Sequence, residues 1–261
     1  MIEPFLSDDA LLENVEAAEA GLWWLGQSGF LVKYEGEHLL LDPYLSDSLT
    51  RKYADTDTPH ERMTRRVIAP ERLGFVDVVT SSHNHTDHLD AETLEPILAA
   101  GARLVCPAAN RNFVAGRLGR IPDVTLGIGE SATLGSFELT AVPAAHTELA
   151  PECAGYLVRV GGATLYHSGD TLLFDGMADG LRPHEVDIAL LPINGALGNM
   201  DAHDAARLAH DIGARVAVPC HYEMFAFNTA DPADFTAACD RLSQPHRVLR
   251  AGERMGLPPD A

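Results

Sequence analysis

Short apolar runs separated by turn residues fill the first part of the chain. The runs at 21–26, 28–34 and 39–43 read GLWWLG, SGFLVKY and LLLDP, with a polar EGEH turn before the third. Runs of this length bounded by glycine and proline predict buried strands. FVDVVTSS at 75–82 is nearly continuous in apolar residues, which predicts a strand covered on both faces. Further along, GYLVRV and ATLYHS flank a glycine pair at 161–162, which predicts a hairpin with a two-residue turn.

A faint internal repeat relates two parts of the chain, 76–107 and 186–219. Each begins with Val-Asp and an apolar strand, passes through a polar loop and reaches Asp-Ala, at Asp90 and Asp201. Each then closes with Gly-Ala-Arg, a short apolar strand and a proline. Aspartate is a good helix N-cap and glycine a good helix terminator, so both parts predict a β–loop–α–β unit. We expect one domain over 1–261, built from two related halves whose polar loops meet at one sheet edge.

An irregular charged stretch runs from Tyr44 to Arg72. Six of the 19 lysines and arginines of the chain fall between Arg51 and Arg72. A solvated loop is one interpretation. The other is a lid over a substrate, since long irregular segments are often functional. In that case Arg65 and Arg66 would contact an anionic substrate group such as phosphate.

Composition narrows the classes of partner. The formal net charge of −19 repels phosphate backbones, so we expect a small-molecule substrate and no nucleic acid. The chain has no apolar run near the roughly 20 residues that a membrane span needs, and its acidic N-terminus does not resemble a signal peptide. We therefore expect a cytoplasmic protein that does not bind membranes. A homo-oligomer is compatible with the sequence.

The densest polar motif is SSHNHTDHLD at 81–90, directly after a predicted buried strand. Residues i and i+2 of an extended chain share a face, so His83 and His85 can hold one metal ion together. Asp87 and His88 fall in the turn toward the following helix and can face a second, adjacent ion. Nitrogen and carboxylate ligands suit zinc, manganese or iron. The motif therefore predicts a metal site rather than a solvated turn.

Three further ligand-type residues follow predicted strands elsewhere in the chain. His146 lies in LTAVPAAHTE, Asp170 in LYHSGDT and His221 in ARVAVPCHYEMF. Each taken alone fits an ordinary structural role, but three such residues at strand ends together favour a completed metal site. Asp42, which ends the strand LLLDP, is a candidate to hydrogen-bond a metal-bound histidine.

This pattern of HxHxDH followed by separate His, Asp and His resembles the metallo-β-lactamase superfamily from about residue 23 to residue 250. The resemblance implies an α/β fold, a four-layer αβ/βα sandwich, with two divalent metal ions at one edge. Zinc and manganese are the expected ions, and iron is also compatible. The resemblance implies that one ion is held by His83, His85 and His146 and the other by Asp87, His88 and His221, with Asp170 bridging both.

More narrowly, WWLGQSGFLVK, YHSGDT and LLPINGALGNMDAHDAARLA resemble the L-ascorbate-6-phosphate lactonases. That resemblance implies a hydrolase in which a metal-bridging hydroxide opens a lactone or cleaves an ester of a small molecule, with or without a phosphate group. Asp87 would orient the nucleophile and take its proton. Asn194, Asn199 and Tyr222 are candidate substrate contacts, although turn roles fit them equally well. A phosphodiesterase of the same fold and a non-catalytic metal-binding protein are the alternatives.

Overall fold

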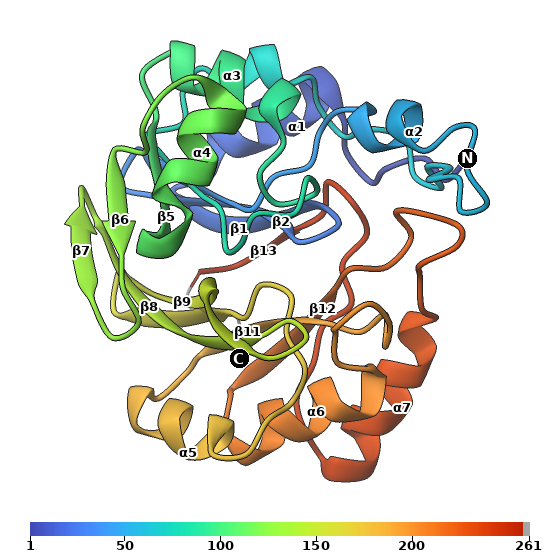
Figure 1. Ribbon diagram of the computed structural model, residues 1–261. Helices are drawn as coiled ribbons and strands as arrows, with labels where there is room; N and C mark the ends of the chain where they lie inside the picture. The colour runs from blue at the N-terminus through green and yellow to red at the C-terminus, as the bar shows by residue number, and fades with distance from the viewer. Residues whose placement is uncertain (258–261) are drawn as a thin grey trace.

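The computed structural model describes residues 1–257. In it two mixed β-sheets pack face to face, and helices cover the outer face of each sheet (Figure 1). The first sheet has the strand order β13-β1-β2-β3-β4-β5-β6 and the second β12-β11-β10-β9-β8-β7. Helices α1, α3 and α4 lie over the first sheet, and α5, α6 and α7 over the second. These layers confirm the predicted four-layer sandwich. Within residues 1–257, every helix is too short or too polar to span a lipid bilayer.

The elements have the following bounds. The first sheet contains β1 (Ala20–Gly26), β2 (Gly29–Tyr34), β3 (Glu37–Leu41), β4 (Val78–Thr80), β5 (Arg103–Pro107), β6 (Val124–Leu126) and β13 (Arg254–Met255). The second contains β7 (Ser131–Leu134), β8 (Phe137–Ala145), β9 (Leu149–Val160), β10 (Ala163–His167), β11 (Ile188–Pro192) and β12 (Val216–Cys220). The α-helices are α1 (Asp8–Ala17), α2 (Ser48–Lys52), α3 (Ala91–Ala99), α4 (Arg111–Leu118), α5 (Met177–Leu181), α6 (Ala202–Asp211) and α7 (Pro232–Leu242), and the short 3₁₀ helices are η1 (Pro70–Arg72), η2 (Ala108–Asn110) and η3 (Arg182–His184).

The glycine pair between β9 and β10 forms the predicted hairpin turn. Val160 and Ala163 are paired in the antiparallel ladder, and Gly161 and Gly162 have φ angles of 57° and 79°. Positive φ at both central residues is the type I′ geometry that glycine adopts without steric cost. A Cβ on Gly161 would also lie 2.3 Å from the ring of Tyr34. This turn therefore needs glycine for conformation and for space.

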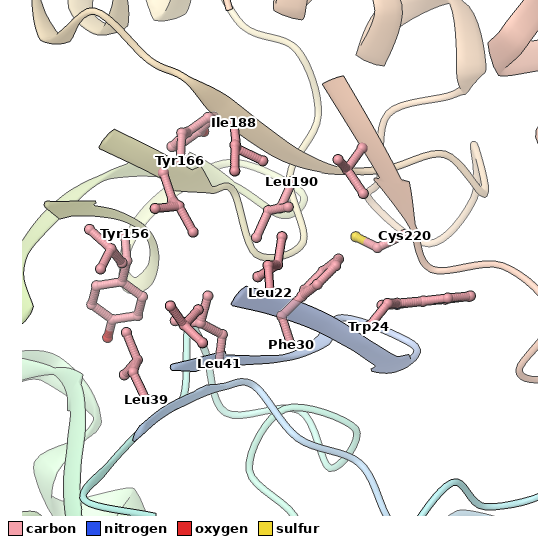
Figure 2. Packing of buried hydrophobic residues seen from close by; sticks show 14 of the residues in the cluster. Leu22, Trp24, Phe30, Leu39, Leu41, Tyr156, Tyr166, Ile188, Leu190 and Cys220 are labelled. Carbon is pink, nitrogen blue, oxygen red and sulfur yellow. The ribbon is translucent and has the colours of Figure 1, made fainter. Parts of the chain in front are cut away.

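Apolar side chains from the facing sheets fill the space between them, as Figure 2 shows. The labelled core residues are Leu22, Trp24, Phe30, Leu39, Leu41, Tyr156, Tyr166, Ile188, Leu190 and Cys220. The hydroxyl of Tyr156 donates a hydrogen bond of 3.0 Å to the carbonyl oxygen of Ser81. This bond joins the core to the start of the histidine-rich loop, so packing between the sheets also fixes that loop.

The two repeated segments form equivalent β–loop–α–β units. Strand β4 leads through α3 to β5, and β11 through α6 to β12, with each strand pair parallel. Asp90 accepts a hydrogen bond from the backbone N–H of Thr93, and Asp201 accepts from those of His203 and Asp204. Both aspartates are therefore N-caps, as predicted.

The predicted strand at 75–82 is shorter than expected. Ladder pairing in β4 stops at Thr80, because the backbone N–H of Ser82 donates to the carboxylate of Asp42 and not to a neighbouring strand. His83 and His85 consequently lie in a loop and not on an extended strand. The irregular stretch from Tyr44 to Arg72 contains only the short helices α2 and η1.

Candidate metal centre

All seven residues proposed as metal ligands lie at one edge of the sandwich. The histidine-rich loop follows β4, His146 follows β8, Asp170 follows β10 and His221 follows β12. They form two groups, and the ligand atoms within each group lie within 4.8 Å of one another. The first group is His83, His85 and His146, and the second is Asp87, His88, Asp170 and His221. The grouping places Asp170 with the second set.

Buried ligand atoms without partners fit two cations at this edge. Nε2 of His83, Nε2 of His88 and Oδ1 of Asp170 are buried, and among the described residues none of these atoms makes a hydrogen bond of normal geometry, although the last two lie 3.2 Å apart. Buried polar atoms are normally satisfied, and leaving one unpaired costs about 1–3 kcal/mol. Metal ligation would satisfy all three. Imidazole nitrogens and carboxylate oxygens are ligands that zinc, manganese and iron share.

Burial lowers the pKa of two ligands of the first group, His83 and His85. It lowers the pKa of His83 well below its usual value, and the neighbouring imidazole of His88 lowers it further. Burial and the nearby imidazole of His146 also lower the pKa of His85. A neutral imidazole is the form that binds a metal ion. His83 and His85 are therefore in the form that binds a metal ion at neutral pH.

The second group combines charges that attract a cation. Burial alone would raise the pKa of Asp170 and Asp87, but the imidazoles of His88 and His221 hold both values below the usual range. Burial alone would conversely lower the pKa of His221, but the two carboxylates raise it to about 9. The pKa of His88 is raised against its burial in the same way. Protons on these imidazoles balance the carboxylates in the metal-free protein, and a divalent ion would release them.

Asp42 supports the second group through a contact with His88. Its Oδ2 lies 2.8 Å from Nδ1 of His88, and its Oδ1 accepts a hydrogen bond of 3.0 Å from Oγ1 of Thr80. A carboxylate that holds the far nitrogen of an imidazole fixes the tautomer that presents the other nitrogen to a metal. The structure therefore places Asp42 where the sequence predicts it, against a proposed metal ligand.

Gln27 contacts the same group and was missed by the sequence reasoning. Its amide nitrogen donates to Oδ2 of Asp87 at 2.8 Å and lies 2.9 Å from Nε2 of His221. Gln27 is buried, with a φ of 51°, in the tight turn between β1 and β2. The only local signal is its position between two predicted strands in the sequence LGQSG. The amide fixes the orientation of the Asp87 carboxylate.

One cavity of about 620 Å³ opens onto the ligands. Five of the seven line it, and they are His85, Asp87, His146, Asp170 and His221. Other parts of the lining carry mainly apolar and aromatic side chains, from α2, from the loop after it and from the segment after β12. These lining residues are Leu49, Lys52, Tyr53, His60, Phe225 and Phe227. Both halves of the chain meet here, since Leu197 and Asn199 of the second polar loop also line the cavity.

Of the three polar residues proposed as substrate contacts, only Asn199 lines the cavity. Its side chain is buried, and among residues 1–257 neither its amide nitrogen nor its amide oxygen has a partner. Asn194 instead donates to the carbonyl oxygen of Ala196 and to the side chain of Asn228, so it holds the loop together.

Tyr222 is a core residue, which corrects the prediction for that position. Its ring stacks on Trp24 with centroids 4.4 Å apart, and its hydroxyl donates to the carbonyl oxygen of Leu249. The preceding Cys220 is also buried in the core (Figure 2). The thiol is accordingly not part of either ligand group.

Arg65 and Arg66 are likewise outside the described lining of the cavity. Arg65 forms an ion pair of 3.2 Å with Glu3, and Nη1 of Arg66 donates to the carbonyl oxygen of Leu45 at 3.5 Å. Both arginines therefore contact groups of the protein itself, and their contact with a substrate stays a prediction. The stretch from Tyr44 to Arg72 instead contributes Lys52, Tyr53 and His60 to the cavity lining.

Comparison with known proteins agrees with this geometry. The family model described as "Beta-lactamase superfamily domain" matches residues 21–221. A UPF0173 metal-dependent hydrolase of Caldivirga maquilingensis is 30% identical over 241 residues, which cover 91% of this chain and 98% of the relative. A second, from Carboxydothermus hydrogenoformans, is 31% identical over 242 residues and covers 90% of this chain and 98% of the relative.

Among solved structures, Igni18, a metallo hydrolase of the archaeon Ignicoccus hospitalis, superposes with a TM-score of 0.70 at 25% identity. The match covers 90% of this chain and 97% of Igni18. Each match spans nearly the whole of both proteins, so the likeness is not confined to the ligand motif. The chain therefore belongs to the UPF0173 family of metal-dependent hydrolases in the β-lactamase superfamily.

Proposed function

We propose that this metal-dependent hydrolase opens a lactone or cleaves a carboxylic ester of a small molecule. The observation that carries the proposal is the shared cavity, where both ligand groups face a space of about 620 Å³ beside an unpartnered amide. A cavity of this size suits a small ligand. The resemblance to L-ascorbate-6-phosphate lactonases supports the cyclic ester. The net charge of −19 supports a small molecule over nucleic acid.

Two divalent ions in the ligand groups would supply a water nucleophile with a pKa near neutrality and polarise the substrate carbonyl. Asp87 contributes an ionised carboxylate at the cavity, oriented by the amide of Gln27. In this position Asp87 would accept a hydrogen bond from the attacking water and so direct its lone pair at the substrate. Because its pKa is low, Asp87 would act mainly by orientation.

Asn199 would bind the ester group itself. The preceding residue, Gly198, packs against His146, whose Nδ1 lies 3.3 Å from the Gly198 carbonyl oxygen. The amide of Asn199 is thereby held beside the first ligand group. A carboxamide nitrogen in this place would donate to an ester oxygen, and its oxygen would accept from a neighbouring hydroxyl.

A phosphorylated substrate would rely on Lys52. Lys52 lines the cavity, whereas Arg51 pairs with Glu92 and Arg62 with Asp47. We expect Lys52→Met to raise KM for a phosphorylated lactone and to leave KM for its unphosphorylated counterpart unchanged. Equal KM changes for both substrates would rule out phosphate recognition by this lysine.

The proposal is tested by restoring Zn²⁺ or Mn²⁺ to metal-free protein and comparing three substrate types. These are γ- and δ-lactones with and without a phosphate, open carboxylic esters, and the phosphodiester bis(p-nitrophenyl) phosphate. Metal-dependent turnover that is fastest on a carboxylic ester or lactone supports the proposal. Turnover of the phosphodiester alone would identify a phosphodiesterase and overturn it.

A further inference from the structure

We propose that the cavity binds an aromatic ring of the substrate, so that the preferred substrates are aryl-bearing esters or lactones. This inference rests on the proposed ester hydrolysis. Its basis is a set of four neighbouring rings that line the cavity, here called the aromatic wall. The aromatic wall consists of Tyr53, His60, Phe225 and Phe227.

His60 stands at the centre of the aromatic wall. Its ring stacks on Tyr53 with centroids 4.2 Å apart and planes 16° apart. The ring centroid of Phe227 is 4.4 Å from that of His60, and the centroid of Phe225 is 5.0 Å from it. Nδ1 of His60 lies 3.0 Å from the carbonyl oxygen of Thr58, which fixes the plane of the ring. The four rings thus form a continuous surface of π-systems.

Part of the aromatic wall is exposed to solvent. Phe227 is 40% exposed, whereas Phe225 below it is only 2% exposed. Leu197, which also lines the cavity, is 65% exposed and lies on the same loop as Asn199. Exposed large apolar side chains gathered around a concave site mark a place where a ligand buries them. A planar ring entering the cavity would cover Phe227 and Leu197 together.

Backbone hydrogen bonds hold the two segments of the wall together. The N–H of Met63 donates to the carbonyl oxygen of Met224 at 2.8 Å. The N–H of Ala226 donates to the carbonyl oxygen of Glu61 at 3.1 Å. Phe225 itself is anchored in a small buried cluster with Tyr44 and Leu49. The wall is therefore formed before a ligand arrives, which lowers the entropic cost of binding.

Charge recognition at this surface is limited to Lys52. Of the two cationic side chains that line the cavity, Arg117 donates to the carbonyl oxygens of Asn84 and Leu89 and stacks on Phe113. Lys52 lies with its Nζ 5.0 Å from the ring centroid of Tyr53. Stacking and edge-to-face contacts remain as the main interactions available to a substrate here.

The test compares benzyl acetate with cyclohexylmethyl acetate, which share the acetyl group and a primary alcohol leaving group. They differ in whether the six-membered ring is aromatic. We expect metal-loaded protein to favour the benzyl ester in kcat/KM by about two- to tenfold, the range of an aromatic pair contact. Phe227→Leu and Tyr53→Leu should each reduce this ratio toward one. Phe5→Leu, which alters an exposed phenylalanine outside the cavity, should leave the ratio unchanged.

A binding measurement separates this inference from the proposed ester hydrolysis. We expect phenylacetate to bind metal-loaded protein about two- to tenfold more tightly than cyclohexylacetate, and Phe227→Leu to remove the difference. If neither ester is hydrolysed but phenylacetate is still preferred, the aromatic site stands and the proposed reaction fails. If both esters are hydrolysed equally and both acids bind equally, the reaction stands and the aromatic site is overturned.

Discussion

Oδ2 of Asp42 lies 2.8 Å from Nδ1 of His88, and both side chains are completely buried. With its Nδ1 proton held by this carboxylate, His88 turns Nε2 toward Asp170, whose Oδ1 is 3.2 Å away. Burial alone would raise the pKa of Asp42, but the hydrogen bond from His88, together with the nearby imidazole of His167, lowers it to about 2. Asp42 is therefore ionised at neutral pH and fixes the tautomer of a proposed ligand.

Replacing Asp42 by asparagine should weaken metal binding at the second ligand group. The neutral amide removes the charge that holds the Nδ1 proton of His88, and loss of such a partner typically weakens metal affinity about 10- to 100-fold. Competition with a chelator of known affinity measures the change. Asp187→Asn is the matched control, because Asp187 accepts a backbone hydrogen bond at the start of β11, away from the ligands. Equal affinities for the two variants would contradict the role given to Asp42.

The pH dependence of stability should differ between metal-free and metal-loaded protein. The pKa of His221 rises from 6.5 to about 9 on folding, because Asp170 and Asp87 outweigh its burial. A raised pKa contributes stability that is complete below pH 6.5 and is lost as the pH increases to about 9. Metal-free protein should therefore lose about 3 kcal/mol of unfolding free energy over this interval.

Metal-loaded protein should not show this loss, since its imidazoles are already deprotonated by ligation. Urea unfolding at pH 6, 7.5 and 9, with and without Zn²⁺, measures both curves. A metal-free protein whose stability stays constant between pH 6 and 9 would show that His221 is not protonated in that state.

The ligand groups could be predicted from the sequence because their signals are local. His83 and His85 are two residues apart, and Asp170 and His221 each follow an apolar strand. Parallel strands bring such ends to one edge. Gln27 carries no comparable signal, since its contacts with Asp87 and His221 span 60 and 194 residues of sequence. A contact between residues so far apart in the sequence depends on how the two sheets pack.

The same limit applies to Arg65 and Tyr222. The charge of Arg65 predicts an anionic partner, and in the structure that partner is Glu3. Tyr222 directly follows a proposed ligand, but its ring stacks on Trp24 in the core. In both cases the residue type indicated a kind of contact, and only the tertiary structure determined which group supplies it.

Gly198 should tolerate no side chain, because it packs against a proposed ligand. A Cβ at this position would lie 1.5 Å from the carbonyl oxygen of His146, and the φ of Gly198 is 88°. Gly198→Ala should therefore displace His146, reduce metal content and lower kcat/KM by more than about tenfold, the effect of about 1.4 kcal/mol. Metal analysis and steady-state kinetics measure these effects.

Gly213→Ala is the control that distinguishes a steric clash with His146 from backbone strain. Gly213 has a similar φ of 71°, and nothing lies within 4 Å of a Cβ built on it. This variant should lose only about 1 kcal/mol of stability from the unfavourable φ and should keep its metal. If both alanine variants lose metal equally, strain and not contact with His146 is responsible.

Asp170 should be required for both ions, as a bridging ligand would be. Its carboxylate oxygens lie 3.2 Å from Nε2 of His88 and 3.3 Å from Nε2 of His221. Its charge also reaches the first group, where it opposes the lowering of the His83 pKa that burial causes. We expect metal analysis of Asp170→Ala to find less than one ion per chain. Asp87→Ala removes a carboxylate from the second group alone and should retain about one ion. If Asp170→Ala still holds two ions, Asp170 does not bridge them.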